Sequence, residues 1–194
     1  METLFAPLAL LPTGWTHSVR LEIGDAGRIL RVDAGVAARA GDRHLAGRVL
    51  LPAPANLHSH AFQRAMAGMT ERRGDAPEGD SFWTWRELMY RFLERLDPDD
   101  IEAIAAFVQM EMLEAGYAAV AEFHYLHHGP DGRPYDAPAE LAQRICAAAA
   151  RTGIGLTLLP VLYGRGGCDG RPLQGGQRRF GADLDGFVPL VEGA

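Results

Sequence analysis

Three consecutive segments, "YAAVAEFHY" (117–125), "DAPAELAQRICAAAARTG" (136–153) and "IGLTLLPVLY" (154–163), decide the fold class. The first and third are short apolar runs with the composition of strands, and the middle segment has the apolar repeat of a helix. The third is apolar on both faces, as a parallel strand is when both its faces are covered. We therefore predict an α/β fold in which strand–helix–strand units build a parallel sheet or barrel.

The same rhythm extends toward the N-terminus. "VLLPAPANLHSH" (49–60) predicts a strand at about 49–58, and "TERRGDAPEGD" (70–80) reads as a loop. "SFWTWRELMYRFLERL" (81–96) then has helical periodicity, and its aromatic residues suggest a helix packed on the barrel wall or at a pocket rim. A further helix follows, with Asp97 as its N-cap, Pro98 in its first position and Gly116 at its end.

The two remaining helical segments complete the pattern. The helix within 136–153 is expected to take Asp136 as its cap and to end at Gly153, and "DLDGFVPLVEGA" (183–194) reads as the start of another helix. Between strand and helix, "GRGGCDGRPLQGGQRR" (164–179) is Gly-rich without a phosphate-binding motif, and we interpret it as a long flexible rim loop or lid.

Two domains are expected. Residues 1–48 form a β-rich segment with a hairpin at 18–38, and residues 49–194 supply three strand–helix units. A (β/α)₈ barrel typically needs about 250 residues. The sequence is therefore interpreted as the N-terminal part of a longer protein, and the alternative is a small three-stranded α/β domain complete in itself.

Composition narrows the class of protein. Apolar residues make up 47% of the chain and charged residues 23%, which is ordinary for a soluble globular protein. The net charge of −6 does not suggest a nucleic-acid surface, and no apolar run approaches the roughly 20 residues of a membrane span. Glu2 stands where a signal peptide would be basic, so a cytoplasmic protein is expected, with Cys146 and Cys168 as free thiols.

The most informative pair of residues is His58 and His60, at the end of the predicted strand 49–58. Side chains two residues apart on a strand point to the same side, and imidazole is a good ligand for Zn²⁺. Barrel active sites lie at the C-terminal ends of the strands, which is where this pair falls. The spacing alone leaves a metal site and an ordinary surface pair both open.

Other polar residues fall at the end of the next strand. Tyr125 could donate to a bound ligand or be a core aromatic residue. We favour a hydrogen-bonded structural role for His124 over that of an inward polar group, and expect His127 and His128 to be exposed or at the rim.

The segments "PANLHSHAFQRAMAGMTERRG" (54–74), "DSFWTWRELMYRFLERL" (80–96), "IEAIAAFVQMEMLEAGYAAVAEFHYLHH" (101–128) and "GIGLTLLPVLYGRGG" (153–167) together resemble the formimidoylglutamate deiminase family of the amidohydrolase superfamily. The resemblance covers nearly the whole chain. It implies the N-terminal portion of a metal-dependent-hydrolase (β/α)₈ TIM barrel, preceded by part of a small β-sandwich built from both chain ends.

The resemblance also implies a function. His58 and His60 would bind one Zn²⁺, while Gln63 and Tyr125 would contact the glutamate part of N-formimino-L-glutamate. The family hydrolyses this small molecule to N-formyl-L-glutamate and ammonia, a step of histidine degradation, and its remaining metal ligands and acid/base residues come from later strands. No catalytic acid/base residue is therefore expected in this chain, and the chain alone should be inactive.

Two alternatives stay open beside this reading: another deaminase of the superfamily acting on a purine, pyrimidine or triazine, and a non-catalytic metal-binding fragment. Neither a nucleic-acid nor a membrane partner is expected, and the full-length enzyme could be a homodimer.

Overall fold

The computed structural model describes residues 1–25, 27–70 and 81–194. The chain forms two compact units, Met1–Ala53 and Pro54–Ala194. Residue 26, within the expected hairpin at 18–38, and residues 71–80 of the expected loop at 70–80 lie outside the described residues.

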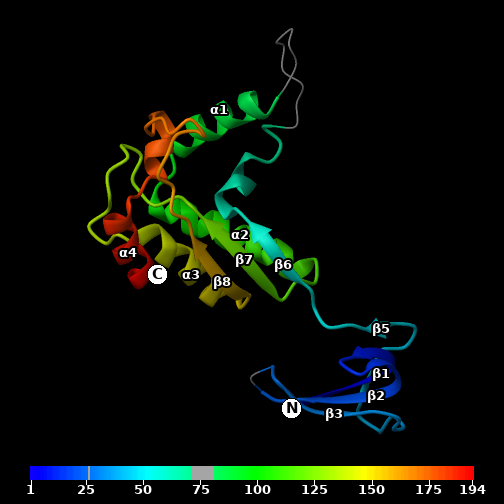
Figure 1. Ribbon diagram of the computed structural model, residues 1–194. Helices are drawn as coiled ribbons and strands as arrows, with labels where there is room; N and C mark the ends of the chain where they lie inside the picture. Colours follow the sequence, from blue (N-terminus) through cyan, green and yellow to red (C-terminus); the bar gives the residue numbers. More distant parts are fainter. Residues whose placement is uncertain (26, 71–80) are drawn as a thin grey trace. The chain divides into compact units, whose positions relative to one another are not determined.

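The first unit is a twisted sheet built on a long hairpin (Figure 1). β1 (Glu2–Leu11) pairs antiparallel with β2 (Gly14–Ile23), which in turn pairs antiparallel with β3 (Ile29–Asp33). The two-residue strands β4 (Arg43–His44) and β5 (Val49–Leu50) both run parallel to β1. The hairpin expected at 18–38 is confirmed, whereas β1, its partner on the other side, was not foreseen.

The expected strand at 49–58 is wrong in its first half. Val49 and Leu50 pair with β1 of the first sheet, and β6 of the second unit begins only at Ala55. Pro52 and Pro54 lie between the two pairings. Because proline has no N–H to donate to a ladder, it separates one strand from the next.

The second unit contains a parallel sheet of β6 (Ala55–Ser59), β7 (Ala119–His124) and β8 (Gly155–Pro160), in the order β6-β7-β8. The expected strand–helix–strand arrangement is confirmed. Since parallel strands end at the same edge, the residues that follow β6, β7 and β8 meet at one end of the sheet.

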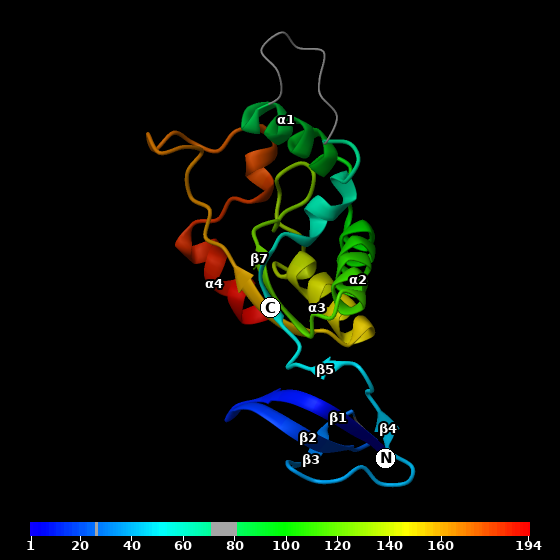
Figure 2. The same cartoon turned by 90° about the vertical axis from the view of Figure 1, so that its right-hand side faces the viewer.

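Helices α2 (Pro98–Glu114) and α3 (Glu140–Thr152) lie side by side against the sheet (Figure 2). Arg144 of α3 bonds to Asp99 and Glu102 of α2, which ties the two helices at their surface. The core beneath them is formed by small and branched apolar side chains, Ile101, Ala105, Leu141, Ile145 and Ala148 among them. On the other side of the sheet Phe123 and Leu159 remain 37% and 42% exposed.

Capping residues explain where most helices begin. Ser81 accepts bonds from the N–H groups of Trp83 and Thr84 at the start of α1 (Phe82–Leu93). Asp97 caps α2 with Pro98 in its first position, and Asp183 caps α4 (Leu184–Gly193). These local signals are strong enough to be read from the sequence, and they confirm the helices expected there.

The expected cap of α3 is wrong. The helix begins at Glu140, after Ala139, and not beside Asp136. Pro138 intervenes, and a proline disfavours helical backbone in the residue before it. Gly153 ends the helix in a left-handed conformation (φ 82°), as predicted.

Two short 3₁₀ segments complete the unit: η1 (Ala61–Met66) follows β6, and η2 (Gly175–Arg179) lies within the Gly-rich stretch. Within the described part of the chain, no helix is long and apolar enough to cross a membrane.

Candidate functional site

The two histidines of the H-x-H motif meet at the C-terminal end of β6. His58 Nε2 and His60 Nε2 lie 3.0 Å apart, with the two rings nearly perpendicular. Two imidazole nitrogens bound to one tetrahedral Zn²⁺ at about 2.0–2.1 Å would be about 3.3 Å apart. The pair is therefore spaced almost as a shared zinc ion would require.

A hydrogen bond fixes the ring of His60. Its Nδ1 lies 2.9 Å from the carbonyl oxygen of Phe123, and because a carbonyl only accepts, Nδ1 must carry the proton. In the neutral ring Nε2 then has a free lone pair, which faces His58. Burial lowers the pKa of His60, opposed by the bond to Phe123, and this favours the neutral form that binds metals.

Gln63 and Tyr125 are brought together beside this pair. Gln63, on η1, donates from Nε2 to the hydroxyl oxygen of Tyr125 over 2.8 Å. The Tyr125 ring meets the His60 ring edge-on at 4.9 Å between centroids. Burial raises the pKa of Tyr125 to about 12, so the hydroxyl keeps its proton at neutral pH. Because that hydroxyl accepts from Gln63, its own proton remains for another acceptor.

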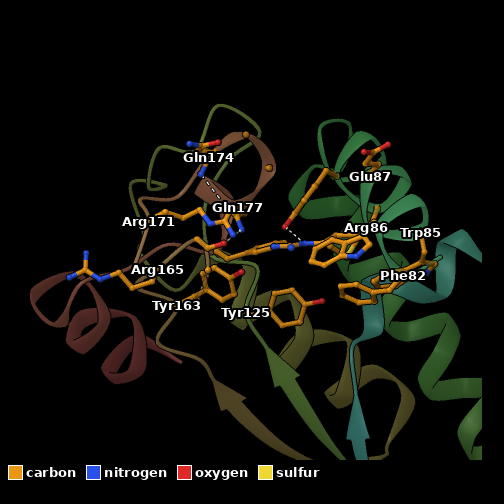
Figure 3. Close-up of a pocket in the computed structure, with 18 of the residues that line it drawn as sticks. Phe82, Trp85, Arg86, Glu87, Tyr125, Tyr163, Arg165, Arg171, Gln174 and Gln177 are labelled. Carbon is orange, nitrogen blue, oxygen red and sulfur yellow. Dashed lines mark hydrogen bonds between the residues drawn. The ribbon is translucent and has the colours of Figure 1, made fainter. Parts of the chain in front are cut away.

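A pocket of about 1370 Å³ opens beside these residues (Figure 3). His60, Gln63 and Tyr125 line it together with α1, Tyr163 beyond β8, and the stretch that leads into η2. The α1 side is aromatic, with Phe82, Trp83 and Trp85. The expectation that the aromatic helix borders a pocket is confirmed.

Arg86 is a pocket residue that the sequence reading missed. It donates from Nε to the Tyr90 hydroxyl over 2.7 Å, and its guanidinium lies over the rings of Trp83 and Tyr90 at 5.7 and 5.3 Å. Stacking of this kind favours a guanidinium cation and holds it in one orientation. The signal was present in the sequence, because residues 83, 86 and 90 share one helix face.

The Gly-rich stretch at 164–179 differs in part from the expected flexible loop. Gln177 is buried, donates to the carbonyl of Gly166 over 3.0 Å and accepts from the N–H of Gln174 over 3.1 Å. Arg179, the last residue of the stretch, is only 1% exposed. It donates to the carbonyl oxygens of Leu93, Leu96 and His128. The end of this stretch is thus part of the core, and its beginning forms the pocket rim as predicted.

The histidines at and beyond the end of β7 depart from expectation in part. His127, expected to be exposed or at the rim, is 1% exposed, and its Nε2 bonds to the carbonyl of Val161. His128 is half-buried, and its Nε2 bonds to the carbonyl of Gly181. Buried His124 has no hydrogen-bond partner for Nε2 among the described residues, so the structural hydrogen bond we favoured is wrong at that atom. Burial lowers its pKa to about 3, which keeps the ring neutral.

The described residues contain no cluster of three or more His, Cys, Asp or Glu side chains that could hold a metal ion. His58 and His60 could therefore supply two ligands, whereas a catalytic zinc usually has three protein ligands.

Comparisons with known proteins agree with this geometry. A family model described as the N-terminal domain of formimidoylglutamate deiminase HutF matches residues 1–46. A formimidoylglutamate deiminase from Pseudomonas aeruginosa is 52% identical over 192 residues, which are 99% of this chain and 42% of that protein. The chain is similar to the N-terminal part of formimidoylglutamate deiminase. The family resemblance seen in the sequence is thereby confirmed.

Solved structures support the same fold. An amidohydrolase from Brucella melitensis is 47% identical with a TM-score of 0.88, over 100% of this chain and 42% of that one. A variant of the atrazine chlorohydrolase TrzN from Arthrobacter aurescens TC1, complexed with zinc and atraton, is 21% identical with a TM-score of 0.59, over 81% and 35%. The chain thus has a β-rich segment followed in sequence by the fold of the N-terminal portion of an amidohydrolase barrel. It spans less than half the length of these relatives.

Proposed function

We propose that this chain is the N-terminal part of an enzyme that hydrolyses N-formimino-L-glutamate to N-formyl-L-glutamate and ammonia with the help of zinc. The observation that carries the proposal is the pair of His58 and His60 Nε2 atoms, 3.0 Å apart, with His60 lining the pocket. Identity of 52% to a formimidoylglutamate deiminase supplies the reaction. The full-length protein is, in this proposal, the chain continued to the length of its relatives.

His58 and His60 would hold the zinc ion through their Nε2 atoms, and the TrzN relative is itself a zinc complex. Zinc, when bound, would supply a hydroxide nucleophile at neutral pH. In the overall reaction the formimino carbon gains the oxygen of water and loses its terminal imino nitrogen as ammonia. It keeps its bond to the nitrogen of glutamate. The proton transfers require an acid/base group, which we assign, with the further metal ligands, to the continuation of the chain.

The pocket residues suit a substrate with two carboxylates. Gln63 and Tyr125 offer neutral hydrogen-bond donors near the histidine pair, and Arg86 offers a guanidinium held against aromatic rings. Such a guanidinium can bind a carboxylate with paired hydrogen bonds. We propose that Gln63 and Tyr125 contact the glutamate part of the substrate, and that Arg86 is a third contact.

The remaining assignments follow from the same proposal. Residues 1–48 would form part of a small composite β-domain, and residues 49–194 the first three strand–helix units of the barrel, with Val49 and Leu50 paired to β1 as noted. We further propose that the full-length enzyme is cytoplasmic and that it could form a homodimer.

Ammonia release tests the proposed function. The full-length protein, supplied with Zn²⁺, is expected to release ammonia from N-formimino-L-glutamate, while guanine, which would also release ammonia on deamination, serves as the control substrate. The 194-residue chain should release none, because two histidines leave a catalytic zinc without a third ligand. Turnover of a control substrate alone would refute the proposed substrate, and turnover by the short chain would refute its incompleteness.

Replacing Tyr125 with Phe should weaken substrate binding more than turnover. The change removes the hydroxyl and keeps the ring that packs against His60. A hydrogen bond to a charged group contributes about 1.5–3 kcal/mol, so KM should rise at least tenfold while kcat changes less than about threefold. Steady-state ammonia release by the full-length protein measures both. Tyr117→Phe is the control, and an unchanged KM in Tyr125→Phe would contradict the assignment.

A further inference from the structure

Glu122 is a buried carboxylate next to the histidine pair with no role in the reaction proposed above. It lies on β7 and is 4% exposed. No arginine or lysine of the described residues forms an ion pair with it, although burying a carboxylate is costly. A charged group retained at such a position needs a physical explanation.

A hydrogen bond ties Glu122 to the residue that follows His60. Its Oε1 accepts from the backbone N–H of Ala61 over 2.6 Å. Ser59, on the other side of His60, is buried and is the partner of Glu122 in the pairing of β6 with β7. Burial raises the pKa of Glu122, and the bond from Ala61 opposes that shift. The backbone that follows His60 is thus held by this side chain.

The next residue of β7 completes the arrangement. The carbonyl of Phe123 accepts a hydrogen bond from Nδ1 of His60, so consecutive residues of β7 hold the ring of His60 and the backbone of Ala61. The ladder cannot do this alone, because the pairing of β6 with β7 shifts register between Asn56 and Ser59. At the start of η1, His60 itself provides no side-chain cap, and the Ala61 N–H goes to Glu122 instead.

We propose that Glu122 is a positioning residue for the metal site: by accepting from the N–H of Ala61 it sets the backbone that aims Nε2 of His60 at Nε2 of His58. The inference rests on the proposed zinc binding by these histidines. The length of the side chain matters in this role more than its charge. Outer-sphere partners of metal ligands typically contribute 10- to 100-fold in metal affinity.

Two conservative variants separate reach from charge. Glu122→Gln keeps the length and an acceptor oxygen for Ala61 but removes the charge, whereas Glu122→Asp keeps the charge and shortens the reach. We expect Glu122→Gln of the full-length protein to bind Zn²⁺ within about threefold of the parent, and Glu122→Asp to bind it 10- to 100-fold more weakly. Zinc affinity is measured by competition with a chromophoric chelator, and matched changes at Glu140 on α3 are the controls.

A spectroscopic signature distinguishes positioning from general stability. With Co²⁺ in place of zinc, Glu122→Asp should show an altered visible spectrum while its far-ultraviolet circular dichroism matches that of the parent. Should Glu122→Asp fail to fold, Glu122→Met, which keeps the length of the side chain but offers no oxygen to the N–H of Ala61, is expected to show the same weakened affinity and altered spectrum.

The possible results distinguish a failure of the proposed zinc site from a failure of the positioning role of Glu122. A parent protein whose zinc affinity is unaffected by His60→Ala would overturn both the metal site and this inference. If the parent binds zinc through His60, then parental affinity and spectrum in Glu122→Asp would overturn the positioning role alone. So would a loss in Glu122→Gln as large as in Glu122→Asp, since it would show that charge, not reach, is required.

Discussion

Replacing His60 with alanine in the full-length protein is expected to lower zinc affinity by more than about 100-fold and to abolish ammonia release. Loss of an outer-sphere partner alone costs 10- to 100-fold in metal affinity, and a lost ligand should cost more. The His60 Nε2 lone pair is oriented toward His58 by the bond from Nδ1 to Phe123, so no rearrangement of the ring is needed for binding.

The matched control is His17→Ala, because His17 is an exposed histidine of the first unit. Zinc content after dialysis and zinc affinity by chelator competition should both remain at the parental value in that variant. Equal zinc affinity in His60→Ala and His17→Ala would contradict the assignment of His60 as a zinc ligand.

Replacing Arg179 with methionine should destabilise the second unit by roughly 3–5 kcal/mol. Its guanidinium donates to the carbonyl oxygens of Leu93, Leu96 and His128, all from a position that is 1% exposed. Each buried carbonyl left without a donor costs about 1–3 kcal/mol. Burial lowers the pKa of Arg179, but the group is held by these bonds and not by a buried carboxylate partner.

Urea unfolding followed by circular dichroism measures this effect. Arg178→Met is the control, since Arg178 is the exposed neighbour of Arg179 on the same 3₁₀ segment. Equal midpoints for the two variants would mean that Arg179 does not join α1 to η2 in the way its contacts indicate.

The parts of the fold that the sequence predicted are those set by local signals. The cap at Asp97 and the glycine at 153 act through their nearest neighbours, so their effect can be read from a few residues. Strand β1 was missed because its partner in the sheet, not its own composition, makes "ETLFAPLALL" a strand. The late start of β6 likewise depends on the pairing of Val49 with Leu8.

The site shows the same division. His58 and His60 could be identified from their spacing and their place at the end of a strand, and the family resemblance added Gln63 and Tyr125. The roles of Glu122 and Arg179 could not be identified from the sequence, because their hydrogen-bond partners lie 61 and up to 86 residues away in the chain. A charged residue in an apolar stretch needs hydrogen-bond partners if it is buried, but the stretch itself does not indicate which residues they are.

The burial of His127 was missed for a related reason. A histidine doublet after a strand is more often exposed than buried, and only the return of the chain at Val161 and Arg179 covers it. Arg86 was the one site residue with a local signal that went unused, since Trp83 and Tyr90 stand three and four residues from it.

His58 and His60 are proposed to form half of a zinc site. A crystal structure of the full-length protein, with diffraction data collected on both sides of the zinc absorption edge, tests this most directly. The anomalous map should show zinc at about 2.0–2.1 Å from Nε2 of both histidines, with Nδ1 of His60 still bonded to the Phe123 carbonyl as it is here. Zinc bound away from these two nitrogens, or to His60 through Nδ1, would contradict the account.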